Sequence, residues 1–174
     1  MDDRLKHPVW GVYDLYRTAR LNVKYYSARL NQFEKYNFTL ELILLISAPS
    51  SAIAGLWFWN TSGGEIVWKF LGVLAAIVAV LKPLLGLNRR IKAYEEVLAG
   101  YRALDHDLYE IKEMVAQKQK FDKELQTDFR KALKRKGVLV NKNPETVQKK
   151  NLKTRLVREV NNELPPEQFY VPDG

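Results

Sequence analysis

The chain has 174 residues, which suits one domain with extensions, and its 28 lysine and arginine residues outnumber its 20 acidic residues to give a net charge of +8. It contains no cysteine, which excludes disulfide bonds and cysteine-based metal sites. Only two histidines are present, so no ordinary set of metal ligands can be assembled, and the sequence has no phosphate-binding glycine loop or nucleophile-elbow motif. We therefore predict that the protein is not an enzyme and uses no cofactor.

Residues 1–37 are predicted to form an N-terminal cytosolic segment built on one amphipathic helix, over residues 8–37. Its apolar residues recur at steps of three and four: Val9, Val12, Tyr16, Ala19, Val23, Tyr26, Leu30 and Phe33. The opposite face is basic. Two interpretations follow, a helix that packs on another helix and a helix that lies on an anionic bilayer.

Two apolar segments come next. Residues 38–59 and 66–87 are each close to the ~20 residues that an α-helix needs to cross a hydrocarbon core. The intervening residues 60–65 can join two adjacent antiparallel helices but cannot return the chain across a bilayer. We predict that residues 38–87 form a two-helix transmembrane hairpin.

Charge and tryptophan placement orient this hairpin. Basic residues precede Asn37 and follow Leu87, whereas the turn between the spans has none, and basic residues mark the cytosolic side. Trp57, Trp59 and Trp68 gather at the turn end, where the headgroups of the far leaflet would accommodate them. We expect both termini to be cytosolic. We also expect no cleavable signal peptide, because the charged residues 1–7 are not followed by an apolar core.

Both predicted spans carry residues suited to helix contacts. The second span has small residues at a spacing that lets membrane helices approach closely: Gly72, Ala75, Ala76 and Ala79. The middle of the first span is interrupted by a proline and serines: Ser47, Pro49, Ser50 and Ser51. The proline is expected to kink the helix. The serines either satisfy the freed backbone of an inert anchor or form a polar stripe that faces other copies or a pore.

Glu41 and Lys82 are charged residues near the cytosolic ends of the two spans. Reflection of one span onto the other about a turn centred near Ser62 places them opposite each other. We expect an interfacial salt bridge or snorkelling side chains, with a role in gating as the alternative.

Residues 88–136 are predicted to form a long cytosolic helix, preceded by a bend at Pro83 and Gly86 and ended by Gly137. Its apolar stripe is expected to pack on that of residues 8–37. The stripe contains Ile91, Tyr94, Leu98, Tyr101, Leu104, Leu108, Ile111 and Val115.

The C-terminal residues 137–174 are predicted to be a basic segment and tail. A short helix is expected over 145–162, ended by two prolines and followed by an extended tail. The preceding basic run is either a solvated cationic surface or a patch for an anionic ligand such as nucleic acid, a nucleotide messenger or acidic lipid. Its residues are Arg130, Lys131, Lys134, Arg135 and Lys136.

Three stretches carry a resemblance to a known family: Leu-Asn-Val-Lys-Tyr-Tyr at 21–26, Asn37-Phe38, and Ile-Lys-Ala-Tyr-Glu-Glu-Val-Leu-Ala-Gly-Tyr-Arg-Ala-Leu at 91–104. Placed around a short-turn hairpin, they resemble the SLATT family, the SMODS and SLOG-associating two-transmembrane effector domains of bacterial nucleotide-signalling and antiviral conflict systems. The likeness covers residues 8–130. It implies a bacterial inner-membrane protein that assembles into pores and kills the cell when a cyclic-nucleotide messenger or a cytosolic sensor protein triggers it. It supplies no catalytic residues.

We therefore expect an all-α membrane protein, with a two-helix transmembrane hairpin flanked by long cytosolic amphipathic helices. The expected function is that of a pore-forming or membrane-disrupting homo-oligomeric effector in antiviral defence. The alternative is a membrane-anchored scaffold that recruits a cytosolic partner through its helical stalk. A soluble protein that buries the hairpin inside a large assembly is disfavoured, because so many apolar residues suit lipid better than a 20.2 kDa core.

Overall fold

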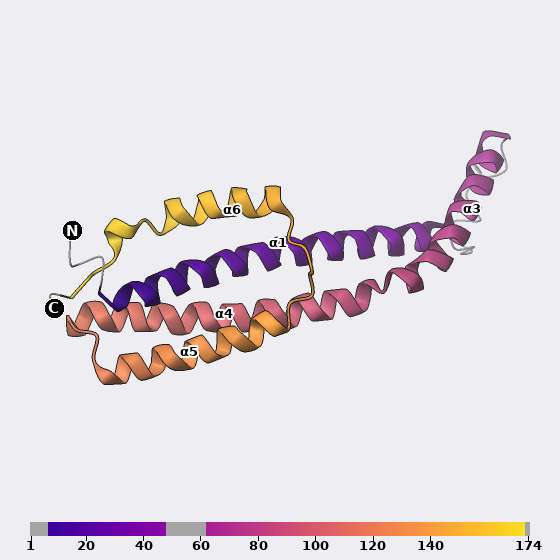
Figure 1. Cartoon of the computed structure of the whole chain (residues 1–174). Coiled ribbons are helices and arrows are strands. Elements are labelled where there is room, and N and C mark those ends of the chain that lie inside the picture. The colour runs from indigo at the N-terminus through magenta and orange to yellow at the C-terminus, as the bar shows by residue number, and fades with distance from the viewer. Residues whose placement is uncertain (1–6, 48–61, 173–174) are drawn as a thin grey trace. The chain divides into compact units, whose positions relative to one another are not determined.

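The computed structural model describes residues 7–47 and 62–172, and in these ranges the protein is all-helical, as the sequence predicts (Figure 1). The elements are α1 (Val9–Ser47), α3 (Ser62–Leu85), α4 (Leu87–Lys118), α5 (Lys123–Asn141), α6 (Lys150–Glu163) and a short 3-10 helix, η3 (Pro166–Gln168). The chain divides into two compact units, the first formed by Met1–Arg29 and Ala93–Gly174 and the second by Leu30–Lys92. Helices α1 and α4 contribute to both units.

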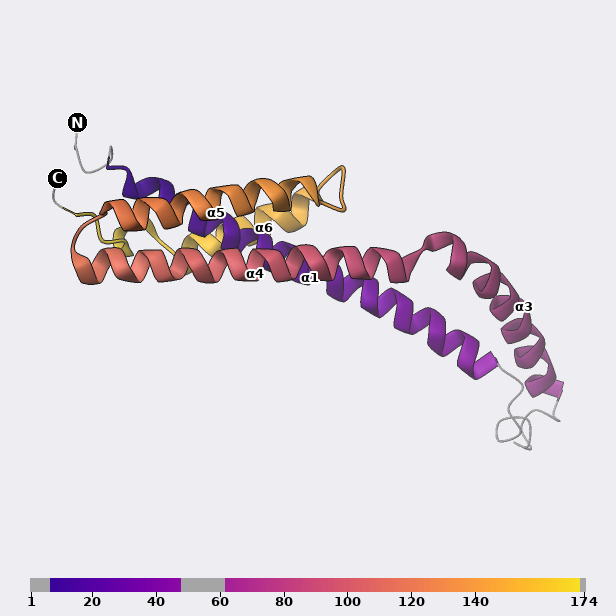
Figure 2. The ribbon, with the colours of Figure 1, turned by 90° about the horizontal axis from the view of Figure 1, so that it is seen from below.

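The first unit is a bundle in which the beginning of α1 and most of α4 run antiparallel. Helix α5 packs along α4 and helix α6 packs along α1 (Figures 1 and 2). The Tyr26 ring of α1 stacks on Tyr101 of α4 with centroids 5.4 Å apart, and it lies 6.1 Å from the ring of Tyr94. These contacts confirm the predicted packing of the two aromatic stripes.

The predicted helix over residues 88–136 is wrong as one element, because the structure divides it into α4 and α5. Gln119, just after α4, has a φ of 52°, a left-handed conformation that ends a helix. Asp122 then caps α5 by accepting a hydrogen bond from the Leu125 backbone N–H at 3.0 Å. The apolar stripe is interrupted between Val115 and Phe121, but this gap contains no proline or glycine to signal the end of a helix.

The C-terminal residues also differ from the prediction. Helix α5 passes through Gly137 and ends at Asn141, since Leu139 is buried against α4 and holds the last turn. The last long helix begins at Lys150 rather than 145. The short helix η3 replaces the beginning of the predicted extended tail. After it the Phe169 ring stacks on Tyr13, with centroids 4.4 Å apart.

The second unit contains the end of α1, all of α3 and the first turn of α4. Helix α1 continues without a break through the predicted boundary at residues 37 and 38. The predicted bend after the second apolar segment is confirmed. Helix α3, with Pro83 in its last turn, stops at Leu85, and Gly86 has a φ of +56° that glycine adopts at little cost.

Among the described residues, no single helix is both long and apolar enough to cross a bilayer. One pair of consecutive helices meets the length and composition criteria when the two are taken together. The pair is Lys69–Leu85 and Leu87–Lys118, with a bend of 43° at the break between them.

Candidate functional site

Helix α3 and the end of α1 present large apolar side chains to the surface. On α3 eight are at least half exposed or close to it: Ile66, Phe70, Val73, Ile77, Val80, Leu81, Leu84 and Leu85. On the end of α1, Phe38 and Leu45 are each about two-thirds exposed, at 65% and 67%. A contiguous apolar surface of this kind marks an interface with lipid or with another protein.

The small residues predicted to mediate helix contacts lie on this same helix. Gly72, Ala76 and Ala79 are exposed, and Ala75 is half-buried. A Cβ added at Gly72 would have no neighbouring atom within 4 Å in the described structure. Space is therefore available there for a close partner.

The polar positions of the first apolar segment are only partly described. Ser47 is the last residue of α1. Pro49, Ser50 and Ser51 lie outside the described residues, so their predicted roles stay predictions.

The predicted pairing of Glu41 with Lys82 is confirmed. Lys82 Nζ lies 3.0 Å from Glu41 Oε1, and it joins the end of α1 to the last turn of α3. The Asn37 side-chain amide donates a second hydrogen bond to the same carboxylate oxygen at 3.0 Å. The position of this pair at a membrane interface stays a prediction.

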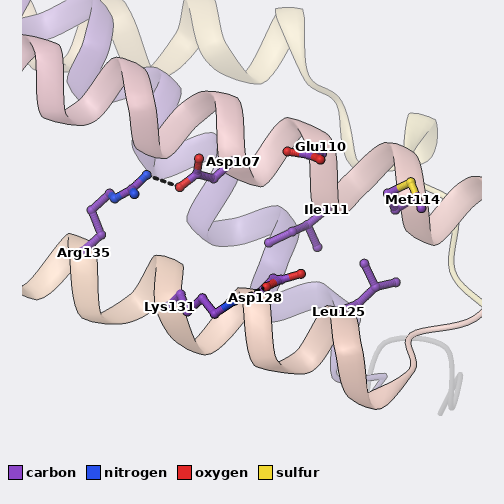
Figure 3. A pocket seen from close by; sticks show the side chains of 8 residues that line it. All are labelled: Asp107, Glu110, Ile111, Met114, Leu125, Asp128, Lys131 and Arg135. Atoms are coloured by element: carbon purple, nitrogen blue, oxygen red, sulfur yellow. Dashed lines mark hydrogen bonds and ion pairs between the residues drawn. The ribbon is translucent and has the colours of Figure 1, made fainter.

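The predicted anionic-ligand patch lies on α5, but its cations do not form one free surface. Arg135 pairs with Asp107 of α4, and Lys131 pairs with Asp128 at 2.8 Å. These four side chains border a pocket of about 340 Å³ between α4 and α5, where Figure 3 shows Arg135 directed at Asp107. The other three predicted cations, Arg130, Lys134 and Lys136, do not line it.

The main polar cluster of the first unit was not predicted from the sequence. The Glu145 side chain is 7% exposed and accepts hydrogen bonds from the Tyr25 and Tyr94 hydroxyls and from Arg29 Nε. Glu145 lies in the α5–α6 connection, whereas its three donors lie on α1 and α4. One buried carboxylate therefore fastens this connection to both central helices.

Neighbouring contacts complete what we call the Glu145 cluster, formed by Glu145, Tyr25, Tyr94, Arg29 and the residues bonded to them. The Tyr26 hydroxyl donates to Asn143 Oδ1 at 3.0 Å, and the same oxygen accepts the Glu145 backbone N–H at 2.9 Å. The Lys149 backbone N–H donates to the Tyr25 hydroxyl at 2.9 Å. The signal in the sequence was Asn-Pro-Glu at 143–145, since Asn-Pro initiates turns. The residues that bond to Glu145 are far away in the sequence, so no local pattern could identify them.

Burial and hydrogen bonding act in opposite directions on Glu145. Burial alone raises the pKa of its carboxyl, but bonds from Tyr25, Tyr94 and Arg29 more than offset this, so the pKa lies below its usual value. Burial raises the pKa of Tyr26 and Tyr94 above their usual value, so both stay protonated and can donate at neutral pH. The cluster is thus a charged acceptor surrounded by permanent donors.

Ion pairs also join α6 to α1. Lys24 Nζ lies 2.6 Å from Glu159 and 2.9 Å from Glu163, both on α6. Arg20 Nε lies 3.1 Å from Asp105 of α4. Burial raises the pKa of the Asp105 carboxyl despite the nearby guanidinium, which identifies Asp105 as a desolvated charge.

Across the described parts of the chain, no three histidine, aspartate or glutamate side chains are grouped so that they could hold a metal ion. Comparisons of the chain with protein-family models, with curated proteins and with solved structures find no match. The site must therefore be interpreted from its own geometry.

Proposed function

We propose that the protein is an oligomeric membrane effector that permeabilises a bilayer when a cytosolic signal reaches its helical bundle. The observation that carries this proposal is the apolar surface of α3 and the end of α1. Leu84 is 77% exposed and Ile66 is 70% exposed, and such side chains along two neighbouring helices are far better accommodated by lipid than by water.

The first unit supplies the control part of this proposal. It has its own core, and the Glu145 cluster and the α1–α6 ion pairs tie its outer segments to the two helices that continue into the second unit. A ligand or protein that displaced the outer segments would act on α1 and α4 directly. This organisation suits an effector that a nucleotide messenger or a sensor protein activates.

The cellular setting follows from the resemblance to the SLATT family. That resemblance supports a bacterial inner-membrane protein that acts in an antiviral or nucleotide-signalled abortive defence system, and the basic residues on both sides of the hairpin support cytosolic termini. A tag inserted at Gly63 and a reporter fused after Gly174 are then expected on opposite sides of the membrane. Detection of both on one side would contradict the hairpin.

Dye release from liposomes tests the function itself. With cytosolic extract or cyclic nucleotides added as the trigger, we expect the reconstituted protein to release an encapsulated dye. We expect Gly72→Leu and Ala76→Leu to weaken assembly and release without preventing insertion. Lipid provides no hydrophobic drive for helix association, so close packing at small residues must supply it. Val73→Phe adds bulk at an exposed apolar position of the same helix and is the matched control.

Two outcomes would change this assignment. If both leucine variants assemble and release dye like the wild type, the small face of α3 does not hold the oligomer. If the wild type inserts but never releases dye with cytosolic extract or cyclic nucleotides added, the membrane-anchored scaffold becomes the better assignment.

A further inference from the structure

A second pocket lies inside the second unit, where α3 breaks from α4. It has a volume of about 320 Å³ and is bordered by Asn37 of α1, by Lys82 of α3 and by Arg89 of α4. Gly86 borders this pocket and separates α3, which ends at Leu85, from α4, which begins at Leu87. Figure 2 shows the break between the two helices. The pocket adjoins the exposed apolar end of α3, where Leu84 and Leu85 are 77% and 47% exposed.

The charge of this pocket is positive. Lys82 forms an ion pair with Glu41, whereas Arg89 is exposed and no carboxylate pairs with it in the described structure. Arg90 and Lys92 extend the cationic surface along the first turns of α4, and both are exposed. An anion is therefore the favoured occupant, and guanidinium groups bind phosphate oxygens well.

Asn37 adds a second requirement. Its Oδ1 atom is shielded from solvent and has no hydrogen-bond donor, whereas its amide nitrogen is already bonded to Glu41. A buried acceptor without a donor is costly, so a fitting ligand must supply a hydroxyl or amine hydrogen as well as an anion. A phosphodiester without other polar groups, which brings only acceptor oxygens at neutral pH, meets half of this requirement.

We propose that this pocket binds the headgroup of an anionic phospholipid that also carries hydroxyl groups, the chemistry of phosphatidylglycerol. The phosphate faces Arg89 and Lys82, a headgroup hydroxyl donates to Asn37 Oδ1, and the acyl chains lie along the apolar end of α3. The inference rests on the proposed membrane function, because it places this break at the cytosolic headgroup level. Basic pockets at the cytosolic ends of membrane helices are a known form of lipid recognition.

The test measures lipid binding to the full chain in detergent by native mass spectrometry, with phosphatidylglycerol, phosphatidylmethanol and phosphatidylcholine as probes. We expect the wild type to prefer phosphatidylglycerol to both other lipids. Arg89→Gln should weaken phosphatidylglycerol binding about fivefold. Arg102→Gln, an exposed arginine farther along α4, removes the same charge away from the pocket and should have little effect.

The hydroxyl contact has its own readout. Asn37→Leu should abolish the preference for phosphatidylglycerol over phosphatidylmethanol, a phosphodiester of the same charge without a headgroup hydroxyl, while an affinity for anionic lipid remains. Equal losses for Arg89→Gln and Arg102→Gln would overturn the site. So would a wild type that binds phosphatidylmethanol as tightly as phosphatidylglycerol.

Two further measurements distinguish an error in the lipid-binding proposal from an error in the proposed membrane function. Soluble glycerol 3-phosphate should not displace the lipid, and displacement at similar concentrations would overturn the lipid assignment in favour of a soluble phosphate ligand. Flotation with phosphatidylcholine vesicles measures membrane insertion independently of headgroup charge. A chain that floats but shows no lipid preference refutes the pocket alone, whereas a chain that never floats refutes the membrane function.

Discussion

Replacement of Glu145 by glutamine is expected to destabilise the first unit by about 3 kcal/mol, which is a large part of the ~5–15 kcal/mol that stabilises a typical domain. The substitution keeps the shape of the side chain but removes its charge. In the wild type one carboxylate oxygen accepts from Arg29 and Tyr94 and the other accepts from Tyr25. Glutamine replaces one of these oxygens with an NH₂ group, so at least one of the three donors loses its acceptor.

The magnitude follows from the burial of the pair. The side chains of Arg29 and Glu145 are only 11% and 7% exposed, so water cannot replace the lost partner. Removal of one member of a buried ion pair typically costs about 3–5 kcal/mol. We take the lower end, because Arg29 keeps other interactions, including one with the face of the Tyr94 ring 5.9 Å away.

The loss in free energy of unfolding is measured by urea unfolding of the detergent-solubilised chain, monitored by the circular dichroism of its tyrosines. Hydrogen exchange should show faster exchange in α6 and in the connection before it. Glu159→Gln is the matched control, because it removes the same charge from a pair with α1 that is half exposed and therefore contributes little. Equal destabilisation by the two variants would refute the argument that the Glu145 cluster fastens the outer segments.

The same contact sets a pH dependence with a definite sign. The folded-state pKa of Glu145 lies below its usual value of 4.5, so its contribution is present above pH 4.5 and is lost as the pH falls toward the folded pKa. The stability difference between the wild type and Glu145→Gln should shrink as the pH is lowered below 4.5. A difference that stays constant would show that the carboxylate is not what the variant disturbs.

Two further comparisons test the packing of the first unit. Gly100→Ala should destabilise it by about 1–3 kcal/mol, because the added Cβ would lie 2.2 Å from a Leu139 methyl. Gly137→Ala should stabilise it by about 0.5–1 kcal/mol, because Gly137 lies inside a helix and its added Cβ would meet no atom within 4 Å. Equal shifts in denaturant midpoint for the two variants would contradict the close approach of α4 and α5. Tyr101→Ala should cost ~2–5 kcal/mol, since its buried ring is removed, and Lys24→Ala should cost much less; similar midpoints for these two variants would show that the aromatic stripes do not pack.

Local pattern was enough to predict most helices, the packing of the two aromatic stripes and the Glu41–Lys82 ion pair. The steps of three and four that predict α1 and α4 depend only on neighbouring residues. Pro83 and Gly86 signalled the bend because each restricts or frees the backbone where it stands. The Glu41–Lys82 pair was predictable because a short hairpin makes partners symmetrical about its turn.

The remaining features required the folded chain. Gln119 divides α4 from α5 with a left-handed backbone, although glutamine is a residue type that is common inside helices. The ion pair of Arg135 with Asp107 joins two different helices, so neither local sequence predicts it. Glu145 meets Tyr94 from 51 positions away and Tyr25 from 120 positions away. Such contacts depend on how whole helices are placed in space, and periodicity along one helix carries no information about that placement. The sequence by itself determined most of the helical segments and their apolar faces, because these depend on neighbouring residues. Only the tertiary structure decided where α4 gives way to α5 and which buried charges meet.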